Sequence, residues 1–314
     1  MAIVDPLCRS KGFLDPLVIQ FKRDERINWD ESFGRQSPLE IEIGFGLGEF
    51  LVRSAAENPQ INFLGVEENW ERIEKTLKKI QQDPALSNIR IIKADARDLF
   101  ERFLDPESVN NIYCLFPCPW LKDRHEKHRL FSEDFLKLVN SRLKTGGLLK
   151  IVTDAKQYYD WIVGQLPSTG FVVEKNVTGA KYQTKFERKW IEHGQKEFFE
   201  LNMVKEKHFP VQVKKGIIMQ SYDIKEFDPQ KFVFPDEKKE ISVILKNMLF
   251  DAQKSKAMLH LIVSEGHLTQ HFWVDIKKTG NAWKISKTDG QNIYLTEGLK
   301  KAVELVYEQA KRAI

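Results

Sequence analysis

Between residues 39 and 154, short apolar runs alternate with amphipathic segments, and this alternation constrains the fold more than any other feature. The amphipathic segments between the runs have helical spacing, clearest over Trp70–Ile80 and Phe131–Leu143. Strands that are apolar over their whole length are typical of a parallel sheet covered on both faces. The five runs are Leu39–Ile43, Ile61–Val66, Ile89–Ala94, Asn111–Phe116 and Leu148–Thr153. The pattern therefore predicts an α/β domain.

After about Lys205 the pattern changes. Four runs joined by short polar links predict antiparallel strands: Ile241–Phe250, Met258–Ser264, Leu268–Lys277 and Trp283–Ser286. A closing helix carries Leu299, Val303, Val306 and Ala310 on one face. We therefore predict three parts: an irregular N-terminal arm (1–37), the α/β domain (38–205) and a small α+β domain with an antiparallel sheet and a C-terminal helix (206–314).

Composition narrows the class of protein. The 314 residues are 42% hydrophobic and 30% charged, which is typical of a soluble globular protein. No run is apolar enough to span a bilayer, and the N-terminus has no signal-peptide core, so we expect a cytoplasmic protein. Residues 206–314 hold 18 of the 49 basic and 14 of the 45 acidic residues, which accounts for the whole net charge of +4. Any basic face on the first 205 residues must therefore come from local clustering.

Glycines and acids stand where the predicted strands end. Gly44, Gly46 and Gly48 follow the first strand, Glu67 ends the second and Asp95 follows the third. Ligands of open α/β sheets bind at these ends, where glycines admit a ligand to the backbone and a carboxylate accepts from ribose hydroxyls or an adenine amino group. Taken singly, each residue also suits a plain turn or a solvated acid. The whole set favours a nucleoside ligand, and without a P-loop lysine a cationic sulfonium fits better than a triphosphate.

Glu42 lies inside the first predicted strand, where a charge is costly unless it is paired. One interpretation is a structural salt bridge. The other is a carboxylate directed at the charged methionine end of the cofactor.

A basic run follows Trp120, from Leu121 to Arg129. Its lysines and arginines suit RNA phosphates, and the alternative is a solvated loop. His125 and His128 have no third ligand nearby in the sequence, so we predict no metal site.

Two short elements are specific enough to suggest a family: Phe116-Pro117-Cys118-Pro119-Trp120 and Thr184-Lys185-Phe186-Glu187. Together with the stretches 42–48, 65–67, 124–125 and 153–154, they make the chain from Leu39 to about Lys205 resemble the bacterial-type tRNA (guanine-N7-)-methyltransferases. The resemblance implies a Rossmann-like, S-adenosylmethionine-dependent enzyme with tRNA as its substrate. Residues 206–314 lie outside the family's common core, and the oligomeric state stays open, a homo-oligomer included.

The resemblance also implies site residues. Those expected to bind the cofactor are Glu42, Gly44, Gly46, Gly48, Glu67, Asp95, Ala96 and Cys118. Those expected to bind the target guanosine or the tRNA are Lys122, Arg124, His125, Lys127, Arg129, Asp154, Thr184, Lys185, Phe186 and Glu187. Asp154 and Glu187 are the candidate catalytic residues, as acceptors for the N1–H and N2–H₂ donors of guanine.

Cys118 departs from the family pattern, which has an aspartate between the two prolines. Since N7 of guanine carries a lone pair and no proton, methylation there needs no general base, and positioning provides much of the acceleration. We therefore expect an active enzyme in which Cys118 is a small packed residue at the boundary between cofactor and base. The alternatives are a relative that methylates another target and a catalytically silent RNA-binding homologue.

Overall fold

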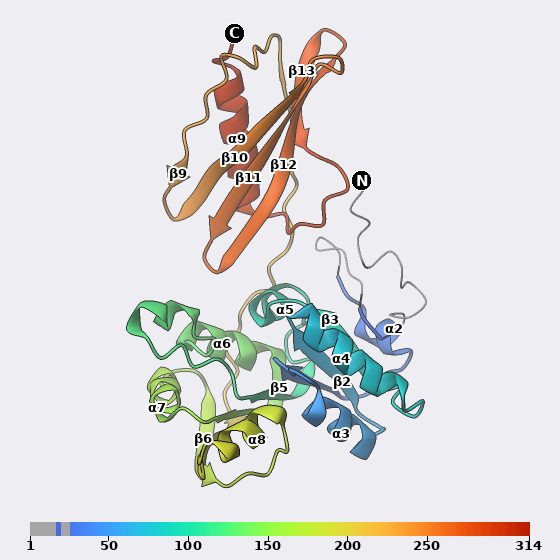
Figure 1. The fold of residues 1–314 in the computed structure, drawn as a ribbon, viewed down its shortest axis with the longest axis vertical. Coiled ribbons are helices and arrows are strands. Elements are labelled where there is room, and N and C mark those ends of the chain that lie inside the picture. Colours follow the sequence, from blue (N-terminus) through green and yellow to red (C-terminus); the bar gives the residue numbers. More distant parts are fainter. Residues whose placement is uncertain (1–16, 20–25) are drawn as a thin grey trace. The chain divides into compact units, whose positions relative to one another are not determined.

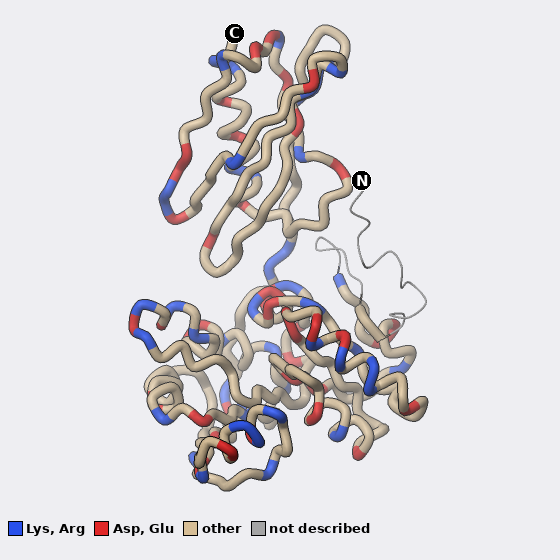
Figure 2. Tube along the Cα trace, viewed as in Figure 1, with Lys and Arg blue, Asp and Glu red and all other residues tan. Residues whose placement is uncertain are grey.

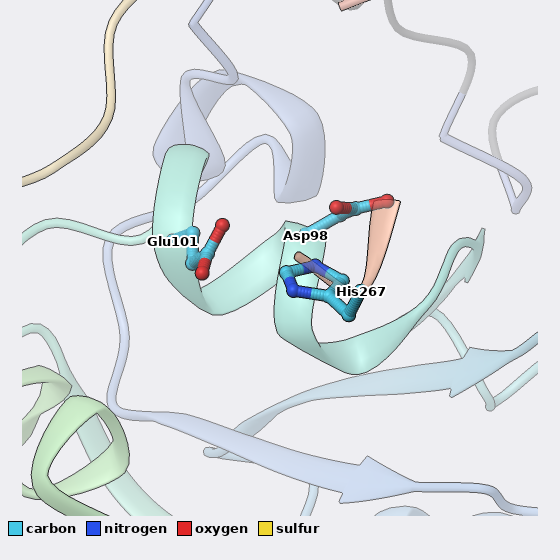
Figure 3. Close-up of side chains that lie close together, drawn as sticks. All are labelled: Asp98, Glu101 and His267. Carbon is cyan, nitrogen blue, oxygen red and sulfur yellow. The ribbon is translucent and has the colours of Figure 1, made fainter. Parts of the chain in front are cut away.

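The computed structural model describes residues 17–19 and 26–314 and divides into two compact units. The first includes residues 27–214 and the second residues 215–314 (Figure 1). The division falls nine residues after the boundary predicted from the sequence, because the chain beyond Lys205 still packs on the first unit. Lys214 donates its backbone N–H to the Glu101 carbonyl (2.7 Å), and its Nζ lies 2.8 Å from the carboxylate of Glu101, whose side chain is drawn in Figure 3.

The first unit is built on a seven-stranded sheet with the order β3-β2-β1-β4-β5-β7-β6. Its strands are parallel except β7, which runs antiparallel to both of its neighbours. Because the chain order reverses between β1 and β4, the carboxyl ends of these strands form the crevice where such sheets bind ligands. The strands are β1 (Leu39–Ile43), β2 (Asn62–Glu67), β3 (Ile89–Lys93), β4 (Val109–Leu115), β5 (Leu143–Thr153), β6 (Phe171–Thr178) and β7 (Phe198–Lys205).

Helices cover both faces of this sheet, as the apolar strands require. On one face, the helices α3 (Glu49–Glu57) and α4 (Trp70–Gln81) pack over β2 and β3 through Leu51, Ile73 and Leu77. On the other face, Phe100 and Phe135 meet with their ring centroids 5.7 Å apart. The helices are α3 (Glu49–Glu57), α4 (Trp70–Gln81), α5 (Ala96–Arg102), α6 (Glu133–Arg142), α7 (Lys156–Gln165), α8 (Lys185–Glu192) and a 3-10 helix, η2 (Asp123–His128).

The second unit is a six-stranded antiparallel sheet with the order β8-β13-β12-β11-β10-β9. The C-terminal helix α9 (Glu297–Ala310) packs its apolar face, with Leu299, Val303 and Val306, on this sheet (Figure 1). The fold is that predicted from the sequence. The strands are β8 (Tyr222–Ile224), β9 (Glu237–Lys238), β10 (Ile241–Asp251), β11 (Lys256–Glu265), β12 (Leu268–Thr279) and β13 (Ala282–Lys287).

The structure differs from the sequence-based expectation at the edges. The predicted irregular arm, 1–37, is described only at 17–19 and from residue 26 on, and Trp29–Phe33 within it forms the helix α2. Asn28 caps this helix, and Trp29 donates from its indole to the Phe103 carbonyl (3.1 Å). The strands β6 and β7 and the helix α8 were not predicted. The burial of β6 alternates, with Val172 and Val177 exposed, so it lacks the apolar run that marks the central strands.

Candidate cofactor and RNA site

The loop after β1 has a backbone that only glycine adopts without strain. Gly44, Gly46 and Gly48 have φ angles of 69°, 58° and 69°. A Cβ atom on Gly48 would lie 2.3 Å from the Thr76 side chain, so this position also lacks room for any other residue. The loop therefore brings backbone N–H groups close to the switch point of the sheet, where a ligand can reach them.

Glu67, at the end of β2, holds this loop to the next strand. Its carboxylate is buried and accepts from the backbone N–H of Gly46 (3.1 Å) and of Asn69 (3.0 Å). Arg72 of α4 lies 3.5 Å from the same carboxylate. The Glu68 backbone N–H also donates to this carboxylate (3.1 Å), so four donors meet its roughly four lone-pair positions, and a ribose hydroxyl would replace the long contact with Arg72.

Asp95 caps the N-terminus of α5, next to the buried Ala96. Its carboxylate accepts from the Arg97 backbone N–H (2.7 Å) and forms an ion pair with the Arg97 guanidinium (2.7 Å). Beside it, burial and the nearby charge of Asp95 raise the pKa of Glu68. The ends of β2 and β3 thus form an acidic rim, as expected from the sequence.

Glu42 is the strongest sign of a ligand in this rim. The residue is 4% exposed, and its Oε2 is buried without a hydrogen-bond partner in the described part of the chain. Burial, followed by the repulsion of Glu49, raises the pKa of Glu42 to about 8. Within residues 17–19 and 26–314 no ion pair forms with Glu42, so a buried carboxyl with one unmet oxygen stands beside the glycine loop, where a positive partner would favour its ionised form. These residues fit a cationic nucleoside such as S-adenosylmethionine.

The segment after β4 is held in a strained conformation. Phe116 and Trp120, which bracket Pro117-Cys118-Pro119, have φ angles of 59° and 44°, a region that costs bulky residues about 1–3 kcal/mol each. Cys118 itself is exposed, so no other part of the described chain packs over it, and its expected place at the boundary between cofactor and base stays a prediction. The strain presents Cys118 to the solvent at the crevice.

Arg129 holds this strained segment in place. Its guanidinium donates to the carbonyls of Pro119 (3.2 Å) and Trp120 (3.3 Å) and lies over the Trp161 ring, 5.0 Å from its centroid. The side chain is only 2% exposed. The family resemblance placed Arg129 among the residues expected to bind tRNA. In the structure its side chain is an internal anchor, so it is not among the tRNA contacts that we propose.

The other basic residues of this region are accessible. Lys122, Arg124 and Lys127, at η2, are exposed, and the His125 ring packs on Trp120 with centroids 5.6 Å apart. Lys122, Arg124 and Lys127 therefore remain available to phosphates, whereas His125 supports Trp120.

Asp154 follows β5, on the same edge of the sheet. The pKa of its carboxyl is raised, because the effect of burial exceeds the opposing effects of a backbone hydrogen bond and of the nearby charge of Lys189 on α8. A half-buried carboxylate beside the crevice is suited to accept from the N–H donors of a base.

The Thr184–Glu187 element is the N-terminal cap of α8. Thr184 accepts from the Glu187 backbone N–H (3.2 Å), and the Glu187 carboxylate reaches back to the backbone N–H groups of Lys181 (2.7 Å), Tyr182 (3.0 Å) and Gln183. Thr184 thus makes the first half of a capping box, while the Glu187 carboxylate binds the N–H groups of the preceding loop. Because Glu187 is 1% exposed and already accepts three donors, its geometry favours a positioning role over recognition of guanine. Lys185 and Phe186 are exposed.

A pocket of about 370 Å³ lies between α4 and α8, beside Gly46. The sequence-based prediction included Gly46, Lys185 and Phe186 from its lining but missed Arg72, Lys75 and Lys189. The spacing of Arg72 and Lys75 puts them on one face of a helix, but a sequence does not tell which surface that face meets.

Known proteins match both units. A family model described as "Putative methyltransferase" matches residues 36–200. The tRNA (guanine-N(7)-)-methyltransferase of Chlorobium phaeobacteroides is 41% identical over 195 residues, which cover 62% of this chain and 93% of that protein. The enzyme of the same name from Thermotoga maritima is 28% identical over 295 residues, 90% of this chain and 92% of that protein, so this match extends into the second unit.

Among solved structures, an antibiotic-related methyltransferase covers 61% of this chain, at 19% identity and a TM-score of 0.47. No helix in the described ranges is long and apolar enough to cross a membrane.

Proposed function

The chain belongs to the tRNA (guanine-N(7)-)-methyltransferase family, and on this premise we propose that it transfers a methyl group from S-adenosylmethionine to N7 of a guanine in tRNA. The observation that carries the proposal is the buried Glu42 carboxyl, whose Oε2 has no hydrogen-bond partner among the described residues, beside a glycine loop and an acidic rim. This arrangement suits a nucleoside that bears a positive charge.

The proposed roles follow from the geometry. The cofactor supplies an electrophilic methyl group. Glu67 and Asp95 accept from its ribose and adenine, and Glu42 faces its cationic end. Asp154 accepts from the N–H edge of the guanine and favours the positive charge that develops on the base. Since no proton leaves N7, the chain needs to position and desolvate the two reactants rather than supply a base.

Glu187 acts indirectly in this proposal. By binding the N–H groups of residues 181–183, it fixes the loop that precedes α8 and so orients Lys185 and Phe186. We therefore assign Glu187 as a positioning residue and Asp154 as the residue that contacts the base. Lys122, Arg124 and Lys127 are the proposed tRNA contacts beside the crevice.

The test is methyl transfer to unmodified tRNA, followed by mass spectrometry of the nucleosides. We expect 7-methylguanosine, and calorimetric titration should show cofactor binding that weakens in Glu67→Ala. Methylation of another nucleoside, or cofactor-binding protein without turnover, would refute the proposal in favour of a differently targeted or silent homologue. Cys118, in place of the family aspartate, is the feature that favours a catalytically inactive homologue. The cytoplasmic location stays a prediction from the sequence, and the oligomeric state stays open, a homo-oligomer included.

A further inference from the structure

The pocket between α4 and α8 is unusually basic. Four exposed cationic side chains line it, together with one acid, Glu71, and the exposed ring of Phe186. The four are Arg72, Lys75, Lys185 and Lys189. Figure 2 shows basic positions along both helices. Because the first 205 residues carry no net charge, this concentration is local.

The lysines of this pocket differ from other lysines of α4 in their ion pairs. Among the residues that the structure describes, no carboxylate forms an ion pair with Lys75, Lys185 or Lys189. Other lysines of α4 are engaged: Lys78 forms an ion pair with Glu74 (2.8 Å), and Lys79 donates to the Leu47 carbonyl (2.6 Å). On α4 and α8, the lysines without an ion pair among the described residues are therefore those that line the pocket, which is the distribution expected of an anion site.

The pocket adjoins the reaction crevice on two sides. Gly46, in its lining, belongs to the glycine loop after β1, which is the proposed cofactor loop. Lys189 is close enough to Asp154 to lower the pKa of its carboxyl. Phe186, 40% exposed, adds an aromatic face with the Arg72 guanidinium 5.9 Å from its centroid. Clustered cations beside an exposed aromatic ring are the features by which proteins hold single-stranded nucleic acid, through phosphates and stacked bases.

We propose that Arg72 and Lys75 of α4, with Lys189 of α8, bind an RNA phosphate next to the target guanosine, in a pocket where Phe186 offers a stacking surface to the adjoining base. The inference rests on the proposed function, because it assumes an RNA substrate. It extends the substrate contact from α8 to α4, so that both helices beside the cofactor loop hold the same nucleotide segment.

The test compares tRNA affinity at KCl concentrations from 50 to 200 mM for three proteins: the wild type, Lys75→Gln/Lys189→Gln and the control Lys78→Gln. Lys78 has the same charge and helix as Lys75 but lies outside the pocket lining. We expect the slope of log affinity against log salt to become shallower by about one unit per lost phosphate contact in the double variant, and to stay unchanged in the control. Equal slopes in all three proteins would overturn the inference.

Two further readouts separate its failure from that of the proposed function. Cofactor affinity, measured by calorimetry, should be unchanged in the double variant; a tenfold loss would assign the pocket to the cofactor and overturn the inference. Methyl transfer by the wild type tests the proposed function alone. A wild type that methylates tRNA with a double variant of unchanged slope would refute only the phosphate pocket, whereas a wild type that neither binds nor methylates tRNA would refute both. Thermal unfolding of the variants checks that these exposed substitutions leave the fold intact.

Discussion

At the scale of single residues, the protonation of Glu42 links the site to pH. Its pKa of about 8 means that the carboxyl is largely protonated near pH 7 before a ligand binds. A positive charge brought next to it favours the ionised form and lowers that pKa. Binding of S-adenosylmethionine at pH 7 should therefore release most of a proton from Glu42.

Calorimetric titration in two buffers of different ionisation enthalpy measures this release. The wild type should release close to one proton more than Glu42→Gln, which also corrects for protons exchanged by the cofactor itself. Identical proton counts would contradict the prediction.

The same group affects stability. Because the folded pKa lies above the unfolded value of about 4.5, the folded state binds more protons between pH 4.5 and 8, and the free energy of unfolding falls as pH rises through that window. Each pKa unit corresponds to about 1.4 kcal/mol, so Glu42→Gln should be the more stable protein at pH 8 by a few kcal/mol in the absence of ligand. Denaturant titrations of both proteins at pH 5 and pH 8 measure the difference.

Cys118 decides whether the family aspartate is essential. The residue is exposed at the crevice, so an aspartate fits there without repacking. Since no proton is removed from N7, Cys118→Asp should change the single-turnover rate of methyl transfer modestly, within about tenfold. A silent wild type alongside a strongly active Cys118→Asp protein would show instead that the carboxylate is required.

At the scale of elements, the basic segment around η2 contains two kinds of arginine that its sequence does not distinguish: one exposed to solvent and one that anchors the fold. Arg124 is exposed, whereas the Arg129 guanidinium is buried on the carbonyls of a strained segment. Arg124→Gln should make the salt dependence of tRNA binding shallower by about one unit without changing the melting temperature.

Arg129→Gln should lower the melting temperature and leave the salt dependence of tRNA binding unchanged. It leaves buried carbonyls and strained residues unsupported, which costs about 2–4 kcal/mol of stability. Thermal unfolding should show the loss, with methyl transfer reduced and the salt slope unchanged. A stable Arg129→Gln protein with a shallower slope would return Arg129 to the tRNA contacts.

The Thr184–Glu187 element likewise combines residues that stabilise the fold with residues that are exposed. A Thr-x-x-Glu sequence before a helix is also the signature of a capping box, and here Thr184 caps the helix while the Glu187 carboxylate binds the loop before it. An element that marks a family by its sequence can thus act by fixing a loop, while the exposed residues inside it, Lys185 and Phe186, are left to meet the substrate.

At the scale of the whole molecule, the two units have separate apolar cores. The Chlorobium relative, of which a 195-residue alignment covers 93%, has no room for a second unit of this size. A fragment of residues 1–214 should therefore fold and bind S-adenosylmethionine within about twofold of the full chain. Circular dichroism and calorimetric titration test this, and a folded fragment that no longer binds the cofactor would show that the second unit completes the site.

The sequence by itself determined the class of both folds and indicated the strand-end residues that we propose for the cofactor site. It could do so because apolar periodicity and the order of glycines and acids are local properties, and a parallel sheet necessarily brings its carboxyl ends to one edge. Only the tertiary structure decided which polar groups are already satisfied. Glu187 accepts from N–H groups and Arg129 donates to carbonyls, Oε2 of Glu42 has no hydrogen-bond partner among the described residues, and Lys75 and Lys189 line one pocket from two helices. These distinctions depend on burial and on contacts between segments far apart in the chain, which no local pattern encodes.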